Sequence, residues 1–134
     1  MKTIKNVLFA LFITTILTSC SNDEQDYSVQ RFDRNITFKV IGEYSGTLTV
    51  AYGNPTSENG VTPGEILTAF PWGKNLDYNR NIKLTAAYVS GENGQPNEII
   101  QIQVFSNGEL VETEIGIADE QGRMFAGTST IYFK

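Results

Sequence analysis

From Asn35 onward, apolar and polar residues alternate along the chain with a period of two. This pattern is typical of strands that bury one face of a sheet and leave the other face in water. No segment sustains a 3.6-residue period with capping residues, so the pattern predicts at most minor helix. The apolar set of these alternations is Ile36, Phe38, Val40, Leu48, Val50, Tyr52, Ile82, Leu84, Ala86, Tyr88, Ile100, Ile102 and Val104.

Glycine, proline and asparagine fall between the alternating runs, where turns are needed. Asn107-Gly108 is the strongest hairpin signal, because this pair tolerates positive φ at both positions of a two-residue turn. Seven short strands in about 100 residues predict an all-β fold, a single small antiparallel Ig-like β-sandwich. The predicted strands are 35–42, 46–52, 65–71, 81–90, 98–106, 109–117 and 124–133.

The last predicted strand places Phe125, Ile131 and Phe133 on one face, with Gly127 and Ser129 between them. A β-rich end suits a strand that closes the sheet. About 100 residues suit one domain and are too few for two independent cores. This part of the chain has no cysteine, so packing must stabilise it without disulfides.

The first 19 residues have the layout of a secretory signal peptide. Lys2 and Lys5 precede the mostly apolar run 7–17, and small residues follow it. The run is too short to span a bilayer comfortably, since about 20 apolar residues are needed. We therefore expect residues 1–19 to be removed.

Leu17-Thr18-Ser19-Cys20 resembles the bacterial lipobox. The resemblance implies that Cys20 is acylated, becomes the first mature residue and anchors the chain to a membrane. The alternative is a secreted protein with a chance cysteine near its cleavage site. Ser21 at the next position favours sorting to the outer membrane. Residues 22–26, which include Asp23, Glu24 and Asp26, resemble the surface-export tag of Bacteroidetes lipoproteins. The alternative is a plain solvated tether. In either case we expect residues 20–34 to be a flexible spacer before a domain at 35–134.

Charge and composition narrow the class of partner. Without residues 1–19, which contain two lysines and no acid, 8 basic residues face 15 acidic ones, a formal charge of −7. An acidic chain without a basic run has no electrostatic attraction to nucleic acid. Histidine is absent from the sequence, and Cys20 is expected to be acylated, so the usual bases and nucleophiles of catalysis are missing. We expect no enzyme activity, no cofactor and no metal site, and the acidic residues of 109–120 fit the spacing of no calcium loop.

Several segments, taken in order, resemble the mycobacterial MmpS small membrane proteins. The matching pieces are "ITFKVIG" (36–42), "GTLTVAY" (46–52), "TAFPWGK" (68–74) and "IQVFSNGELV" (102–111). The resemblance implies a small Ig-like sandwich on the outer side of a membrane, acting as an accessory to an RND-type exporter. Two features depart from that family: its pair of cysteines near the late strands is absent, and a lipobox replaces the transmembrane helix.

Three aromatic residues are candidates for a ligand site. Trp72 could form a platform for a sugar or lipid, although a tryptophan in a sandwich more often packs in the core. Tyr44 and Tyr78 lie near predicted loops and are expected to be exposed, as is Tyr27 near the tether. The sequence thus predicts a non-enzymatic accessory module of the cell envelope, held to the membrane by its lipid and partnered by an exporter. The alternatives are a surface module that binds glycans or small molecules, and a purely structural envelope protein.

Overall fold

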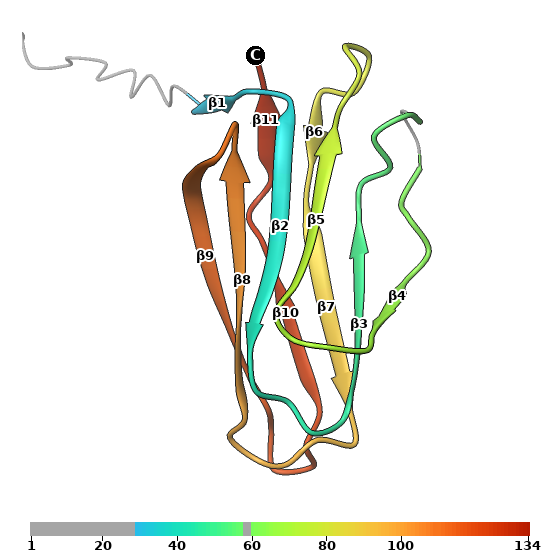
Figure 1. The fold of residues 1–134 in the computed structure, drawn as a ribbon, viewed down its shortest axis with the longest axis vertical. Coiled ribbons are helices and arrows are strands. Elements are labelled where there is room, and N and C mark those ends of the chain that lie inside the picture. Colours follow the sequence, from blue (N-terminus) through green and yellow to red (C-terminus); the bar gives the residue numbers. More distant parts are fainter. Residues whose placement is uncertain (1–28, 58–59) are drawn as a thin grey trace, which may run out of the picture.

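A computed structural model describes residues 29–57 and 60–134 of the chain. The signal peptide, Cys20 and Tyr27 lie outside these residues. Within them there is no helix, and the strands form two packed four-stranded sheets with a smaller sheet at one end (Figure 1). The predicted all-β antiparallel sandwich is confirmed.

Two antiparallel sheets make up the body, here named sheet I and sheet II. Sheet I contains, in spatial order, β5 (Trp72–Asp77), β2 (Asn35–Gly42), β8 (Ile99–Ser106) and β9 (Glu109–Ile117). Sheet II contains β10 (Met124–Gly127), β7 (Ala87–Glu92), β3 (Thr47–Tyr52) and β4 (Glu65–Leu67). The third, the end sheet, contains β1 (Arg31–Phe32), β11 (Ile131–Phe133) and β6 (Leu84–Thr85), with β1 parallel to β11.

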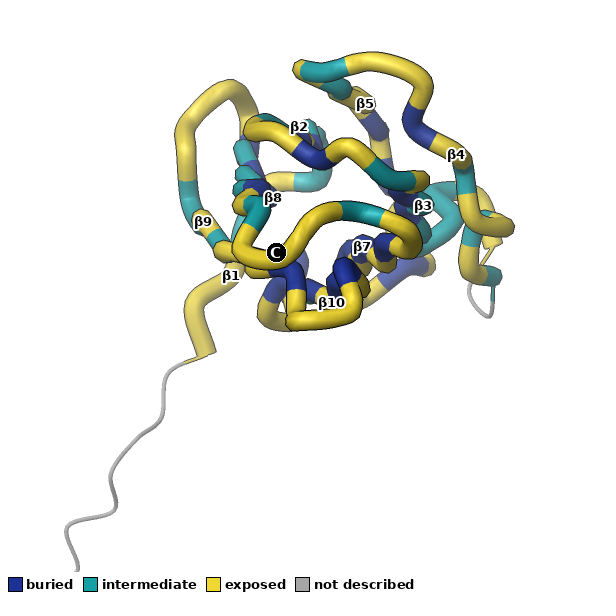
Figure 2. Tube along the Cα trace, turned by 90° about the horizontal axis from the view of Figure 1, so that it is seen from below, coloured by how far each residue is buried: buried dark blue, intermediate teal, exposed yellow. Residues whose placement is uncertain are grey.

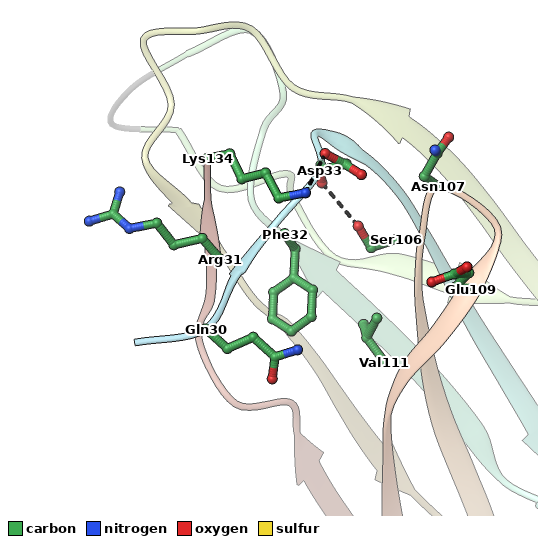
Figure 3. Close-up of a pocket in the computed structure, with 9 residues that line it drawn as sticks. All are labelled: Gln30, Arg31, Phe32, Asp33, Ser106, Asn107, Glu109, Val111 and Lys134. Carbon is green, nitrogen blue, oxygen red and sulfur yellow. Dashed lines mark hydrogen bonds and ion pairs between the residues drawn. The ribbon is translucent and has the colours of Figure 1, made fainter. Parts of the chain in front are cut away.

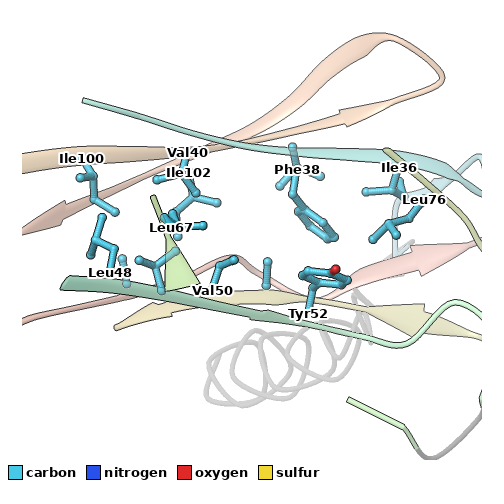
Figure 4. Close-up of a cluster of buried hydrophobic side chains, with 14 of the residues drawn as sticks. Ile36, Phe38, Val40, Leu48, Val50, Tyr52, Leu67, Leu76, Ile100 and Ile102 are labelled. Atoms are coloured by element: carbon cyan, nitrogen blue, oxygen red, sulfur yellow. The ribbon is translucent and has the colours of Figure 1, made fainter. Parts of the chain in front are cut away.

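The core lies between sheets I and II, as the alternation predicts. Phe38 on β2 and Val50 on β3 are fully enclosed, and their side chains point toward the opposite sheet (Figure 4). Buried residues alternate with half-buried or exposed ones along these strands (Figure 2). The predictions for 35–42, 46–52, 98–106 and 109–117 agree with β2, β3, β8 and β9 to within one residue.

The hairpin between β8 and β9 turns at the predicted pair. Asn107 and Gly108 have φ of 50° and 84°, so both turn residues are left-handed. A bulge between Val104 and Phe105 shifts the register of the two strands. The hairpin prediction is confirmed.

The predicted strand 65–71 is wrong at its C-terminal end. β4 stops at Leu67, and the chain then crosses to the other sheet and forms β5, which the alternation did not reveal. The inward positions of β5 are Trp72, Lys74 and Leu76, since they pair with the buried residues of β2. Lys74, at the central inward position, interrupts the alternation of apolar residues along this edge strand.

The predicted strand 81–90 is split into β6 and β7, and its face is wrong after Ile82. Ile82 is buried as expected, but Leu84 and Tyr88 point outward. Two successive exposed residues, Lys83 and Leu84, shift the alternation by one position. Ala86 is consequently only half-buried. The inward residues of this stretch are Thr85, Ala87 and Val89.

The predicted closing strand 124–133 is also split. Thr128, Ser129 and Thr130 separate β10 in sheet II from β11 in the end sheet. Ile131 and Phe133 are buried as predicted, whereas Phe125 is 71% exposed. Met124 and Ala126 occupy the inward positions of β10 instead.

The folded body begins earlier than Asn35, because β1 lies within the segment assigned to the tether. Arg34 holds this end together: its guanidinium donates to the carbonyls of Asn79 and Ile82, both at 2.7 Å, and to that of Lys134 at 2.8 Å. It also lies over the ring of Phe133, 5.3 Å from the centroid. These contacts join β1, β11 and the segment before β6.

Candidate functional site

Trp72 lies where the edge strands β4 and β5 form one side of the sandwich. It is half-buried against the core, and its ring lies 6.3 Å from that of Tyr52. Beside it, inward-facing Lys74 of sheet I reaches Glu65 of sheet II at 3.9 Å. Inward-pointing charge of this kind protects a sheet edge from pairing with other chains. Trp72 therefore packs on the core and leaves part of its side chain in solvent.

Tyr44 is buried, so the expectation that it is exposed is wrong. Its hydroxyl donates to the carbonyl of Gly122 at 2.6 Å, which links the β2–β3 loop to the β9–β10 loop. Burial raises the pKa of Tyr44, and the nearby carboxylates of Glu98 and Asp119 raise it further. The ring thus fastens the loops at one end of the sandwich and offers no free face to a ligand.

A second group ties the β2–β3 loop to the β7–β8 loop. Glu98 accepts backbone N–H bonds from Ser45 at 3.0 Å and from Gln95 at 2.9 Å. These bonds lower the pKa of Glu98, because they favour the ionised carboxylate. Its role in the structure is therefore that of a loop tie.

Tyr78 is also buried, with 4% of its surface exposed. Its hydroxyl donates to the carbonyl of Gly53 at 2.9 Å and accepts from the Thr85 hydroxyl at 2.8 Å. Burial raises its pKa to about 12, against the opposing effect of the Thr85 hydrogen bond. Of the three aromatic candidates, only Trp72 keeps an exposed part.

A hollow of about 290 Å³ lies between β1 and the β8–β9 turn (Figure 3). Phe32 and Val111 line its apolar part, and an ion pair of 3.1 Å between Lys134 and Asp33 crosses its rim. The Ser106 hydroxyl donates to the carbonyl of Asp33 at 3.3 Å. Lys134, Asp33 and Ser106 thus bind within the protein, while Gln30, Asn107 and Glu109 supply the other polar side chains at the hollow.

The outward face of sheet II carries two exposed aromatic side chains, Tyr88 and Phe125, whereas the large exposed apolar residues of β8 and β9 in sheet I are aliphatic: Ile99, Leu110, Ile115 and Ile117. One row across the four strands of sheet II is formed by Phe125, Ser90, Thr49 and Ile66, which are paired in register. Tyr88 lies in the next row, and its ring is nearly parallel to that of Phe125, with centroids 6.2 Å apart. We name this surface the Phe125 face. The alternating pattern does not reveal this face, because it places Tyr88 and Phe125 on the inward side.

A second hollow, of about 280 Å³, adjoins Tyr88. Val61, Leu84 and Ile82 supply apolar lining, and Asn54 and Ser57 supply polar atoms. Both Val61 and Leu84 are exposed. The apolar surface around Tyr88 therefore extends from sheet II toward β6.

Within the described part of the chain, three or more potential metal ligands nowhere come together. The same residues include no helix of the length and apolarity needed to cross a membrane. The chain matches no protein-family model, and no curated protein or solved structure is detectably similar to it. The resemblance to the MmpS proteins thus stays a prediction from sequence.

Proposed function

We propose that this chain is a lipid-anchored, non-enzymatic accessory or binding module of the bacterial envelope, carried on the outer membrane. The observation that supports the proposal is the sequence Leu17-Thr18-Ser19-Cys20 behind a short apolar run with a basic start. Lipid attached at Cys20 replaces a transmembrane helix as the means of anchoring.

The distance between anchor and body follows from the start of β1. Ten residues separate Cys20 from Arg31, and a fully extended chain of that length reaches about 35 Å. The end sheet is then the membrane-proximal end of the body. The loops at the other end, which connect β2 to β3, β7 to β8 and β9 to β10, face away from the bilayer (Figure 1). Confinement this close raises the effective concentration toward any membrane neighbour.

The test of the anchor is the chemical state of Cys20. Full-length protein is expressed in bacteria supplied with an alkyne-labelled fatty acid and is compared with Cys20→Ala. We expect label on the wild-type chain alone, recovery of that chain in the outer membrane, and diacylglyceryl-cysteine at its mature N-terminus by mass spectrometry. An unmodified Cys20, or wild-type protein that is free in the cytosol, refutes the proposal.

For the partner, we propose an RND-type exporter on the strength of the MmpS-like segments alone. Capture of the native lipoprotein from detergent extracts tests this, and recovery without any transporter subunit counts against it. The alternative, a glycan or small-molecule site, retains Trp72 of its three candidate residues. Unchanged Trp72 fluorescence across a panel of sugars and lipids removes that alternative.

A further inference from the structure

We propose that the Phe125 face is a self-association surface, on which a second copy of this chain packs face to face. The proposal starts from exposure. Phe125 is 71%, Ile66 62% and Tyr88 46% exposed, although side chains of these types are usually buried. Phe125 and Tyr88 are neighbours, whereas Ser90 and Thr49 lie between Phe125 and Ile66 in the register of the sheet. Exposed apolar patches on soluble domains mark interaction sites.

The flatness of the face has a local cause. Tyr88 lies opposite Gly127 on β10, and a side chain on Gly127 would collide with the Tyr88 ring. The glycine therefore leaves room for the ring to lean over β10 toward Phe125. The two rings are inclined by only 22°. At a centroid separation of 6.2 Å, nearly parallel rings are displaced sideways, so each keeps a face for an outside contact.

The near absence of charge on the face is compatible with a second copy as the occupant. Among the outward residues of β10, β7, β3 and β4, Glu92 is the single charged one, and it lies at the end of β7. Protein interfaces likewise lack charge at the centre and are enriched in aromatic residues. A second copy presents the same uncharged face, so the two surfaces meet without burying an ion. The formal charge of −7 then stays on the outside of the pair.

Two other occupants fit less well. A sugar stacks on aromatic rings but also needs well-placed polar groups beside them. The pairing partners of Tyr88, Gly127 and Ala51, carry none, and the nearby polar side chains on sheet II are the short hydroxyls of Ser90 and Thr49. The longer polar side chain of Asn54 lies in the adjoining hollow. An anionic bilayer surface attracts basic residues, and the charged member of this face is an acid.

The area agrees with a weak pair. Since a fully buried aromatic side chain contributes about 150 to 250 Å², the exposed parts of Phe125, Tyr88, Ile66 and the adjoining Leu84 and Val61 amount to about 500 Å² per copy. Complete burial of these parts on two copies removes at most about 1,000 Å² from water, below the roughly 1,200 Å² at which stable interfaces begin. Such a pair forms best where the chains are concentrated. The expectation that the pair forms at the membrane therefore rests on the proposed lipid anchor.

Crosslinking through one introduced cysteine tests the arrangement. Sheets stacked face to face lie about 10 Å apart, farther than the 4.4 to 6.8 Å between the Cα atoms of a disulfide. A bis-maleimide of matching length is therefore applied to membranes of cells that make the full-length chain. Ser90→Cys places a thiol at the middle of the Phe125 face, and Gln103→Cys places one at the middle of the outer face of sheet I.

We expect a dimer-sized adduct from Ser90→Cys and at least a tenfold lower yield from Gln103→Cys. Adding Ile66→Glu to Ser90→Cys should reduce the adduct at least fivefold. Adding Ile115→Glu should leave it unchanged, because Ile115 has a similar exposure, 57%, but lies on β9 of sheet I. Substitution at either exposed isoleucine leaves the core intact, which a thermal melt of each variant checks.

Three results overturn the inference: monomer only from Ser90→Cys, an adduct of Ser90→Cys with a different protein, or equal yields from the two cysteine positions. Crosslinking of the wild-type chain, in which Cys20 is the single cysteine, tests the proposed lipid anchor separately. A crosslinked wild-type dimer shows that the Cys20 thiol is free, which contradicts the proposed function. The comparison of faces is then repeated in a Cys20→Ser background, where it still supports or refutes self-association.

Discussion

Replacing Tyr78 with phenylalanine removes one oxygen atom from the centre of a three-way junction. The Tyr78 hydroxyl joins the segment after β5 to Gly53 at the end of β3 and to Thr85 on β6. Its ring also packs on Phe133 of β11, with centroids 5.0 Å apart. The substitution keeps the ring contact and removes both hydrogen bonds.

The expected loss of stability follows from the groups left behind. Thr85 is 2% exposed, so its hydroxyl loses a buried partner that water does not replace. Leaving a buried donor or acceptor unsatisfied costs about 1 to 3 kcal/mol. For a domain of this size, each kcal/mol lowers the melting temperature by about 4 to 8 °C.

The pH dependence gives a second, independent signature. Burial raises the folded pKa of Tyr78 to about 12, while the unfolded value is about 10. Between these values the unfolded chain binds fewer protons than the folded one, so the free energy of unfolding falls as pH rises. At pH 11 the wild type should have lost about 1.4 kcal/mol through this group alone. Tyr78→Phe cannot show this loss.

The measurement is urea denaturation followed by far-UV circular dichroism at pH 8 and pH 11. Other tyrosines and lysines titrate in both proteins, so the difference between wild type and variant isolates Tyr78. Tyr132→Phe is the matched control, because Tyr132 is 38% exposed and lies on the outer side of β11. Equal stability of wild type and Tyr78→Phe at pH 8, or the same slope between pH 8 and 11, would refute the reasoning.

Three further predictions use the same denaturation assay. Phe38→Ala should cost about 3 to 5 kcal/mol, because it empties the centre of the core, whereas Phe125→Ala should change stability by less than about 0.5 kcal/mol. Arg34→Lys should cost about 2 kcal/mol, because an ammonium group cannot reach all three carbonyls that the guanidinium binds. Glu98 has a lowered pKa, so its contribution is present above the ordinary value near 4.5 and disappears as pH falls through the lowered one. Glu98→Gln should weaken this acid dependence, and equal pH profiles would contradict it.

The central strands were predictable because they bury one complete face. On β2 and β8 every inward residue is apolar or a small hydroxyl, and each strand has neighbours on both sides. The two-residue period therefore survives without interruption. The hairpin at Asn107-Gly108 was predictable for a local reason, since few residue pairs adopt positive φ twice in succession.

The edge strand β5 escaped prediction because its inward positions lie partly in water, whereas β9, at the other edge of sheet I, follows the predicted hairpin and was found. On β5 the side chain of Lys74 extends from the core side to Glu65, and the apolar period is broken at its centre. The two buried tyrosines were misplaced for another reason. A tyrosine near a loop can bury its ring when a backbone carbonyl accepts from its hydroxyl, as Gly122 and Gly53 do for Tyr44 and Tyr78. Sequence spacing does not reveal such long-range partners.

The remaining errors concern neighbouring strands, and they bear on the proposed self-association. Leu84, Tyr88 and Phe125 were all assigned inward from their apolar character, and all lie on the outer side of β6, β7 and β10. The errors at Leu84 and Tyr88 have one cause, the shift of the alternation at Lys83 and Leu84, and the error at Phe125 is separate. Local sequence rules tend to fail where a surface has a function. If a second copy covers the Phe125 face, these side chains are buried in the assembly, on the side of the sheet opposite to the one that the alternation predicts.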